Sequence, residues 1–311
     1  MFIIINQGGL GNQLFQYAFA KQLQKHTQRK VILGSTVTFK KDTLGRIDIL
    51  PELNTTIPST KGFQQFSTNM MFRIHRSLAK KRNPAPQPFR NFTFKYESDL
   101  PPPYDSAFFE KLGSCQIPGK IALAGYWQDA AITNPNKEEL LQEFQYQSSI
   151  PKTIGMTDDI SKWEAMIRES ITQETNEPVA IHFRQNFKGD GPLKADYYEH
   201  AIGLIAEKTQ NPFFYVFADD NNKAKEILQG CLPQDKYLLF PHYKDARQAY
   251  QTILLMAKCQ HFVMSNSTFC WWAAWMSWAK NPDADNYYVM PSKGFGDPFS
   301  FSDKCLIIHS E

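Results

Sequence analysis

The sequence lacks any run of about 18 apolar residues, so nothing in it is typical of a transmembrane helix. The apolar residues 2–5 are too few for a secretory signal, and no basic segment precedes them. Cysteine is scarce, with five residues that are never spaced as Cys-x-x-Cys. This usage excludes a disulfide framework and a zinc ribbon and favours free thiols in a reducing compartment. We therefore expect a cytoplasmic protein.

Net charge is small as well. The sum of 34 Lys and Arg against 31 Asp and Glu is +3, too little for a protein that coats nucleic acid. Residues 53–96 nevertheless contain eight Lys or Arg and no Asp or Glu. Within residues 70–82, Met70, Ile74 and Leu78 recur every four residues beside basic side chains. This pattern predicts a helix with one of two roles. The helix contacts the inner face of an anionic membrane, or it packs on its own domain and leaves a basic face in solvent.

Short apolar runs alternate with helical patterns in the C-terminal half. The runs are residues 179–184, 213–218, 237–240, 261–265 and 286–290, and the helical patterns are residues 195–209, 222–229, 245–258 and 268–279. Repeated strand, helix and strand units build a parallel sheet covered on both faces. Ligands of such folds bind at the carboxyl ends of the strands. Trp271, Trp275 and Trp278 share one helical face and are expected to pack on the sheet.

The N-terminal half begins in the same way. A strand at residues 2–5, a helix at 12–26 and a strand at 30–33 are followed, after a basic and proline-rich region, by a strand at 121–126. A proline, a glycine and an N-cap pattern between residues 150 and 163 mark a junction. We predict two α/β domains, residues 1–155 and 156–311.

Four segments carry candidate chemistry. A glycine-rich turn at residues 8–11 follows a strand and opens a helix, which suits close approach of an anion, but it lacks the features of a nicotinamide fingerprint and of a P-loop. His182 and Arg184 fall on one face at the end of a strand, and Arg binds phosphate in a bidentate manner. Asp219 follows the next strand and suits ribose or guanine, whereas Asp220 is placed to cap a helix. The hydroxyls and amide of residues 265–268 precede a helix and suit a diphosphate.

Taken in order, these segments resemble the motifs of the bacterial-type α-1,2-fucosyltransferases, glycosyltransferase family 11. The resemblance rests on GGLGNQLFQYAFA at residues 8–20, His-x-Arg at 182–184, FADD at 217–220 and SNSTFCWWAAW at 265–275, with a further Gly-Tyr-Trp-Gln element at 125–128. It implies a GT-B-like pair of Rossmann-type domains with a deep cleft between them. It also implies that L-fucose is transferred, with inversion and without a metal or other cofactor, from GDP-β-L-fucose to the 2-hydroxyl of a terminal β-galactose.

The resemblance also implies roles for particular residues. The C-terminal domain would bind GDP-fucose and the N-terminal domain would face the acceptor, with Arg184 neutralising the leaving diphosphate. The donor-binding residues would be Gly9, Gly11, Asn12, His182, Arg184, Lys188, Asp219, Ser265, Asn266, Ser267 and Thr268. The acceptor-binding residues would be Gln13, Trp127, Gln128 and Asp129.

The sequence departs from the family after His182 and Arg184. Gln185 stands where a second Arg is usual and Phe187 where an Asp is usual, while Lys188 and Asp190 follow nearby. Lys188 is placed to restore the charge. Asp190, between two glycines, is our predicted catalytic base, with Asp129 as the rival.

Two alternatives stay open. Asp283 and Asp285 form an Asp-x-Asp sequence, which would suit a metal-dependent glycosyltransferase of another sugar. The second alternative is a nucleotide- or sugar-binding module without turnover. Release of GDP in the presence of galactosides would distinguish an enzyme from such a module.

Overall fold

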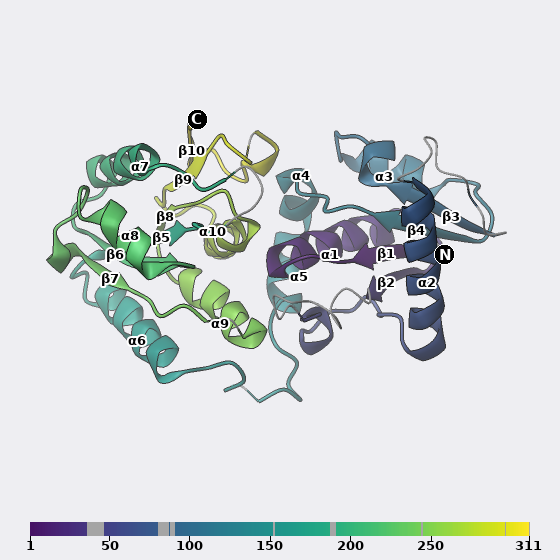
Figure 1. The fold of residues 1–311 in the computed structure, drawn as a ribbon, viewed down its shortest axis with the longest axis horizontal. Helices are drawn as coiled ribbons and strands as arrows, with labels where there is room; N and C mark the ends of the chain where they lie inside the picture. The colour runs from purple at the N-terminus through teal and green to yellow at the C-terminus, as the bar shows by residue number, and fades with distance from the viewer. Residues whose placement is uncertain are drawn as a thin grey trace. The chain divides into compact units, whose positions relative to one another are not determined.

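A computed structural model of the chain describes residues 1–35, 47–79, 87, 91–151, 153–186, 191–243, 245–295 and 297–310. The chain divides into two compact units, Met1–Ile150 and Pro151–Glu311 (Figure 1). This division falls five residues before the junction that the sequence predicts. Each unit is built on a parallel sheet with helices on its faces.

The first unit contains a four-stranded sheet in the order β2-β1-β4-β3. Its strands are β1 (Phe2–Asn6), β2 (Val31–Ser35), β3 (Phe92–Tyr96) and β4 (Lys120–Ala124). All three pairings are parallel, and all five residues of β1 are buried. The chain adds β2 on one side of β1 and β4 on the other, so the strand order reverses between β1 and β4. Such a switch point is where an open α/β sheet binds its ligand.

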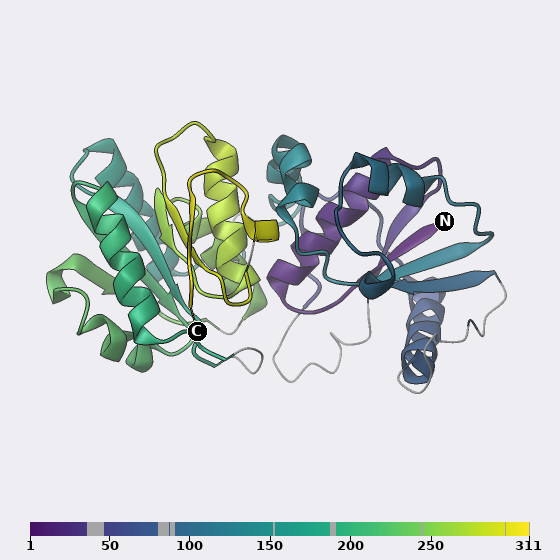
Figure 2. The same cartoon turned by 90° about the horizontal axis from the view of Figure 1, so that it is seen from above.

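Helices cover both faces of this sheet. They are α1 (Leu10–Lys25), α2 (Gly62–Ala79), α3 (Ser106–Gly113), α4 (Ala130–Thr133) and α5 (Lys137–Glu143). Phe72 of α2 packs in one cluster with Ile3, Ile5 and Ile32. Figure 2 shows α2 and α3 on opposite sides of the strands. The helix predicted at residues 70–82 is confirmed as far as Ala79, and Lys80 to Arg82 lie outside the described residues.

The second unit contains six parallel strands in the order β10-β9-β8-β5-β6-β7. They are β5 (Glu177–Phe183), β6 (Pro212–Ala218), β7 (Tyr237–Leu239), β8 (His261–Val263), β9 (Tyr288–Pro291) and β10 (Cys305–Ile308). The first strand of the unit is central, with the second and third on one side and the last three on the other. This is the strand order of a dinucleotide-binding Rossmann fold, and its switch point lies between β5 and β8.

The helices of this unit are α6 (Asp158–Thr172), α7 (Ala195–Lys208), α8 (Asn221–Leu228), α9 (Ala246–Met256) and α10 (Thr268–Lys280). The five strands and four helices predicted between residues 179 and 290 are all present. Trp271 and Trp275 of α10 are fully buried, as expected, whereas Trp278 is only half-buried. In the described parts of the chain, no helix combines the length and apolarity needed to cross a bilayer.

Candidate functional site

The candidate donor site lies at the switch point of the second unit. β5 and β8 pair side by side, so the segments that follow their carboxyl ends are neighbours. His182 and Arg184 come from the end of β5, and Ser265 to Ser267 follow β8. Residues that are separated by about 80 positions in the sequence therefore meet at one edge of the sheet, where ligands of this fold bind.

A hydrogen bond joins the two segments. Nδ1 of His182 and Oγ of Ser265 are 2.7 Å apart, and the imidazole stacks on Phe269. Burial lowers the pKa of His182 to about 3, with smaller contributions from the charges of Arg184 and His242. The imidazole is therefore neutral at pH 7 and serves as a hydrogen-bonding group rather than as a cation.

Arg184 supplies the positive charge of this edge. Its Nη1 lies 3.1 Å from Oδ2 of Asp219, and 40% of its side chain is exposed against 7% of the Asp219 side chain. The same carboxylate accepts hydrogen bonds from the backbone N–H groups of Gln185 at 2.7 Å and Asn186 at 3.1 Å. Asp219 therefore fixes the backbone after β5 and orients the guanidinium, while direct contact of Asp219 with GDP stays a prediction. Asp220 caps α8, as expected.

In the segments that follow β5 and β8, two buried side-chain atoms have no hydrogen-bond partner within the described residues: Nε2 of Gln185 and Oδ1 of Asn266. The other end of the Asn266 amide donates to the carbonyl of Gly191 at 3.1 Å, so its orientation is fixed. An unpaired buried donor or acceptor is destabilising by about 1–3 kcal/mol. A polar ligand that pairs with both atoms would remove this penalty.

The turn between β8 and α10 is hydrogen-bonded to Cys270, a residue whose role the sequence analysis did not predict. The thiol of Cys270 donates to the carbonyl of Ser267 at 3.1 Å and to that of Ser265 at 3.4 Å. Burial raises the pKa of Cys270 to about 11, so the thiol stays protonated. Ser267 caps α10 by accepting from the N–H of Phe269, and Thr268 is the first residue of the helix. The hydroxyl-rich turn is thus held by hydrogen bonds within the protein itself.

Lys188 and Asp190 lie outside the described residues. The residues on either side of residues 187–190 are bound to the same edge of the sheet. The backbone N–H of Asn186 donates to Asp219, and the carbonyl of Gly191 accepts from the Asn266 amide. The roles of Lys188 and Asp190 stay predictions.

The switch point of the first unit gathers the predicted acceptor residues together with Gly9, Gly11 and Asn12, for which donor binding stays a prediction. The turn at Gly8 follows β1, the Tyr126 to Asp129 segment follows β4, and Nε2 of Gln128 donates to Oδ1 of Asn12 at 2.7 Å. Gly8 has a φ of +87°, and a Cβ there would lie 2.8 Å from Nδ2 of Asn12. Only glycine fits that close approach. Gly9 is the N-cap of α1, and Gly11 lies buried in its first turn.

Gln13 and Trp127 are in this region but are fully buried. The Gln13 amide donates to the carbonyls of Gly8 and Ile47 and accepts from the N–H of Ile49, which uses its hydrogen-bonding capacity. The Trp127 ring stacks on Phe19 with centroids 4.1 Å apart. Both side chains hold the loops in place and are buried in the structure, and their predicted contact with an acceptor stays a prediction.

The exposed aromatic at this edge is instead Tyr126, with 42% of its surface accessible. Glu97, directly after β3, accepts from the N–H of Tyr126 at 2.8 Å and from that of Trp127 at 3.0 Å. A Cβ on Gly8 would lie 3.2 Å from the Tyr126 ring, so the ring borders the glycine turn. No sequence pattern indicates Glu97, because its role depends on the pairing of β3 with β4.

Asp129 is largely buried at the start of α4. It caps that helix by accepting from the N–H of Ala131 at 2.8 Å. Burial raises the pKa of its carboxyl group, and the hydrogen bond from Ala131 opposes the increase. A carboxylate with a raised pKa is a better proton acceptor than an exposed one.

The Asp-x-Asp sequence of Asp283 and Asp285 lies away from the candidate donor site, just before β9. Asp285 pairs with Lys304 and accepts a hydrogen bond from the hydroxyl of Tyr287. It precedes β9 and is therefore at the amino edge of the sheet, opposite the edge that carries His182 and Arg184. A metal at Asp283 and Asp285 would not reach the candidate donor site.

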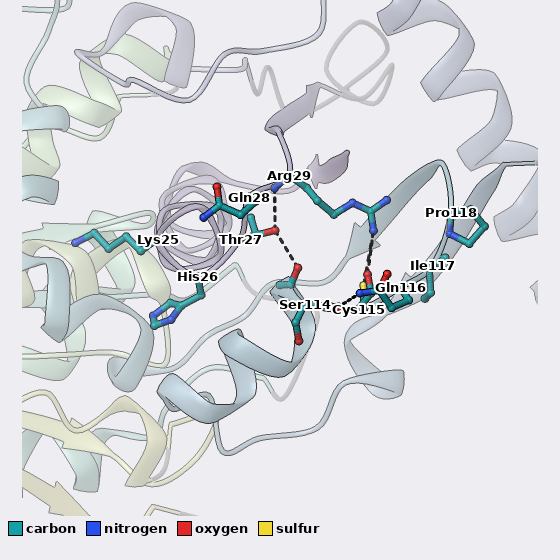
Figure 3. Close-up of a pocket in the computed structure, with 11 residues that line it drawn as sticks. Lys25, His26, Thr27, Gln28, Arg29, Ser114, Cys115, Gln116, Ile117 and Pro118 are labelled. Atoms are coloured by element: carbon teal, nitrogen blue, oxygen red, sulfur yellow. Dashed lines mark hydrogen bonds between the residues drawn. The ribbon is translucent and has the colours of Figure 1, made fainter.

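A pocket of about 670 Å³ in the first unit is also at an amino edge (Figure 3). Its lining comes from residues 25–29 and 113–118, which precede β2 and β4. Figure 3 shows the guanidinium of Arg29 turned toward the second of these segments, where it donates to the carbonyl of Cys115. The pocket is thus separate from the glycine turn and from Tyr126.

Two Rossmann-type units, each with an all-parallel sheet and with polar side chains gathered at its switch point, define the GT-B class of glycosyltransferase fold. The predicted fold class is confirmed in this respect. The deep cleft expected between the domains stays a prediction.

Comparisons with known proteins point to the same family as the sequence motifs. The model of glycosyl transferase family 11 matches residues 193–291. The O-antigen biosynthesis glycosyltransferase WbnK of Escherichia coli is 27% identical over 305 residues, which are 93% of each chain. The alpha-1,2-colitosyltransferase of Escherichia coli is 24% identical over 283 residues, which are 86% of this chain and 85% of that protein.

Among solved structures, NodZ alpha-1,6-fucosyltransferase soaked with GDP-fucose is similar with a TM-score of 0.47 and 14% identity, covering 88% of this chain and 92% of that chain. The resemblance to family 11 that the sequence motifs predict is confirmed by the family model and the two relatives. The chain is thus similar to glycosyl transferase family 11 over residues 193–291, and the two relatives support glycosyltransferase activity.

Proposed function

We propose that the protein transfers L-fucose from GDP-β-L-fucose to the 2-hydroxyl of a terminal β-galactose, with inversion at the sugar carbon and without a metal. The observation that carries the proposal is the edge between β5 and β8. The segments that follow these two strands carry the exposed guanidinium of Arg184 and two buried side-chain atoms without a hydrogen-bond partner, Nε2 of Gln185 and Oδ1 of Asn266.

The donor half of the proposal follows from charge. Negative charge develops on the diphosphate as the glycosyl bond breaks, and a cation that is already in position lowers that barrier. Arg184 is such a cation because Asp219 holds it at the edge of the sheet. The neutral His182 and the rigid turn at Ser265 and Ser267 add hydrogen-bonding groups for the GDP moiety.

The acceptor half of the proposal concerns the first unit. An exposed aromatic ring beside polar side chains is suited to a sugar, because one face of galactose is apolar and its hydroxyls need partners. Tyr126 provides the ring, and the linked amides of Gln128 and Asn12 provide donors and acceptors. We assign the galactose contact to these three residues.

The acceptor hydroxyl must lose a proton during transfer. We keep Asp190 as the proposed base because Asn186 and Gly191, on either side of its segment, are fixed at the donor edge. Asp129 is the rival, supported by its burial and its raised pKa. In both cases the carboxylate accepts the proton as the oxygen attacks.

Product analysis tests the proposal. The purified protein is mixed with GDP-β-L-fucose and a panel of β-galactosides, and the linkage of each product is determined. We expect fucose on the 2-hydroxyl of galactose together with release of GDP. A second arm replaces the donor by GDP-colitose, since one relative is an alpha-1,2-colitosyltransferase. Exclusive use of that donor would overturn the fucose assignment, and GDP binding without turnover would indicate a binding module.

A further inference from the structure

One helix of the first unit exposes an apolar stripe to solvent. Phe66, Met70 and Ile74 of α2 are 62%, 46% and 42% exposed. They recur every four residues, so they lie on one face of the helix. Within the described residues, the other exposed large apolar side chains are Tyr126 and Ile171, which lie far apart in the sequence. The exposed apolar surface is therefore concentrated on α2, and we call these three residues the α2 stripe.

The opposite face of α2 already packs on its own domain. Thr68, Asn69, Phe72 and His75 are buried, and the ring of His75 stacks on Phe94 of β3. Nδ1 of His75 also lies 2.9 Å from the hydroxyl of Tyr96. The helix thus has a complete contact with the sheet without the α2 stripe. Folding of the first unit does not require the stripe to be covered.

The charges around the stripe are of one sign. Lys61, Arg73 and Arg76 are exposed on or beside α2. The sequence contains no Asp or Glu between Leu53 and Tyr96. Arg73 falls within 20° of Phe66 on a helical wheel of 100° per residue, so a cation lies directly beside the apolar surface. An apolar face bordered by Arg and Lys is the pattern of helices that lie in the interface of an anionic membrane.

We propose that α2 docks the protein on an anionic lipid surface. Phe66, Met70 and Ile74 enter the boundary between headgroups and acyl chains, while Lys61, Arg73 and Arg76 contact the negative headgroups. A second copy of the chain fits this surface less well, because a symmetric contact between two α2 stripes brings like charges together. The proposal is independent of the fucosyl transfer proposed above.

Vesicle sedimentation tests this proposal with the full chain. We expect binding to vesicles of phosphatidylcholine with 30% phosphatidylglycerol and binding at least about tenfold weaker to phosphatidylcholine alone, since each basic residue near an anionic surface contributes about 1 kcal/mol. Raising the salt concentration should weaken binding to the anionic vesicles. Equal binding to both vesicles, or binding to neither, would overturn the proposal.

Variants separate the stripe from other surfaces. The triple variant Phe66→Gln, Met70→Gln, Ile74→Gln should lose vesicle binding at least about tenfold, and Arg73→Gln with Arg76→Gln should lose it by a similar factor. Ile171→Gln is the matched control, an exposed apolar residue of α6 in the other unit, and should bind like the original chain. All three proteins should transfer sugar to a soluble galactoside at the original rate. Unchanged vesicle binding by the triple variant, or a loss of self-association in its place, would refute the assignment.

Discussion

Nδ1 of His182 and Oγ of Ser265 are 2.7 Å apart, and this contact joins the ends of β5 and β8 where the strand order of the second unit reverses. The first unit has a counterpart, because the Gln128 amide donates to Asn12 between the ends of β4 and β1. Each sheet therefore has a hydrogen bond between two side chains across its switch point. These bonds fix the loops that carry the candidate donor and acceptor residues before any substrate is present, which favours binding and catalysis.

Replacing Arg184 tests the leaving-group role. We expect Arg184→Ala to lower kcat by about 100-fold or more, because the departing GDP loses the cation that Asp219 holds in place. Arg168→Ala removes an exposed arginine of α6 and should have no effect. Steady-state kinetics with GDP-fucose and a galactoside measure both variants. A kcat for Arg184→Ala within about threefold of the original would disprove the role.

Chelation tests whether the mechanism needs a metal. We expect full activity in excess EDTA, because the guanidinium of Arg184 carries the positive charge that a metal would otherwise supply. The alternative site at Asp283 and Asp285 is at the opposite edge of the sheet. If EDTA abolishes turnover and Mn²⁺ or Mg²⁺ restores it, the cationic-side-chain mechanism is wrong.

The exposed ring of Tyr126 should determine acceptor affinity. We expect Tyr126→Ala to raise KM for the galactoside about tenfold and to leave KM for the GDP donor unchanged, since aromatic contacts contribute about 0.5–1.5 kcal/mol beyond area burial. Tyr126→Phe keeps the ring and should retain most of the affinity. Far-UV circular dichroism provides a check that the loop change leaves the fold intact. An unchanged acceptor KM for Tyr126→Ala would contradict the contact.

The buried imidazole should make stability depend on pH. The pKa of His182 is about 3 in the folded chain against 6.5 for an ordinary histidine. Between these values the unfolded chain binds a proton that the folded chain does not, so the free energy of unfolding falls as the pH falls from about 6.5 towards 3. The slope from this group is on the order of 1 kcal/mol per pH unit.

Urea titrations between pH 7 and pH 4 measure this slope. His182→Gln carries no titrating ring, so its stability should fall less steeply over that range than that of the original chain. His309→Gln, which replaces an exposed histidine, is the matched substitution control. Equal slopes for His182→Gln and the original chain would show that His182 does not dominate the pH dependence.

The sequence predicted the second unit well because its strands and helices alternate with clear periods, and because parallel pairing places the ends of β5, β6 and β8 at one edge. It predicted less of the first unit. β3 is a short strand after a proline-rich stretch, so neither the strand nor the Glu97 carboxylate that follows it was recognised. The burial of Gln13 and Trp127 was not foreseen for a different reason. Their residue types suit sugar binding, but burial depends on tertiary packing that no local pattern reveals.

The identity of the base is the last point that variants can decide. An aspartate is ionised at pH 7, so what distinguishes two candidates is position relative to the acceptor hydroxyl. If Asp190 accepts the proton, Asp190→Asn should bind GDP with near-native affinity while kcat for transfer falls about 100-fold or more. Asp129→Asn should then lower kcat only slightly, because asparagine caps a helix as well as aspartate does and preserves the start of α4.

Calorimetric GDP titration and single-turnover kinetics separate binding from chemistry in both variants. The reverse pattern, with a large loss in Asp129→Asn alone, would assign the proton transfer to the buried carboxylate of the first unit. That assignment would also agree with the raised pKa of Asp129, because the pH at which kcat begins to fall should then lie above the ordinary range of an aspartate. A fall in kcat only at the ordinary aspartate range would argue against Asp129 as the base.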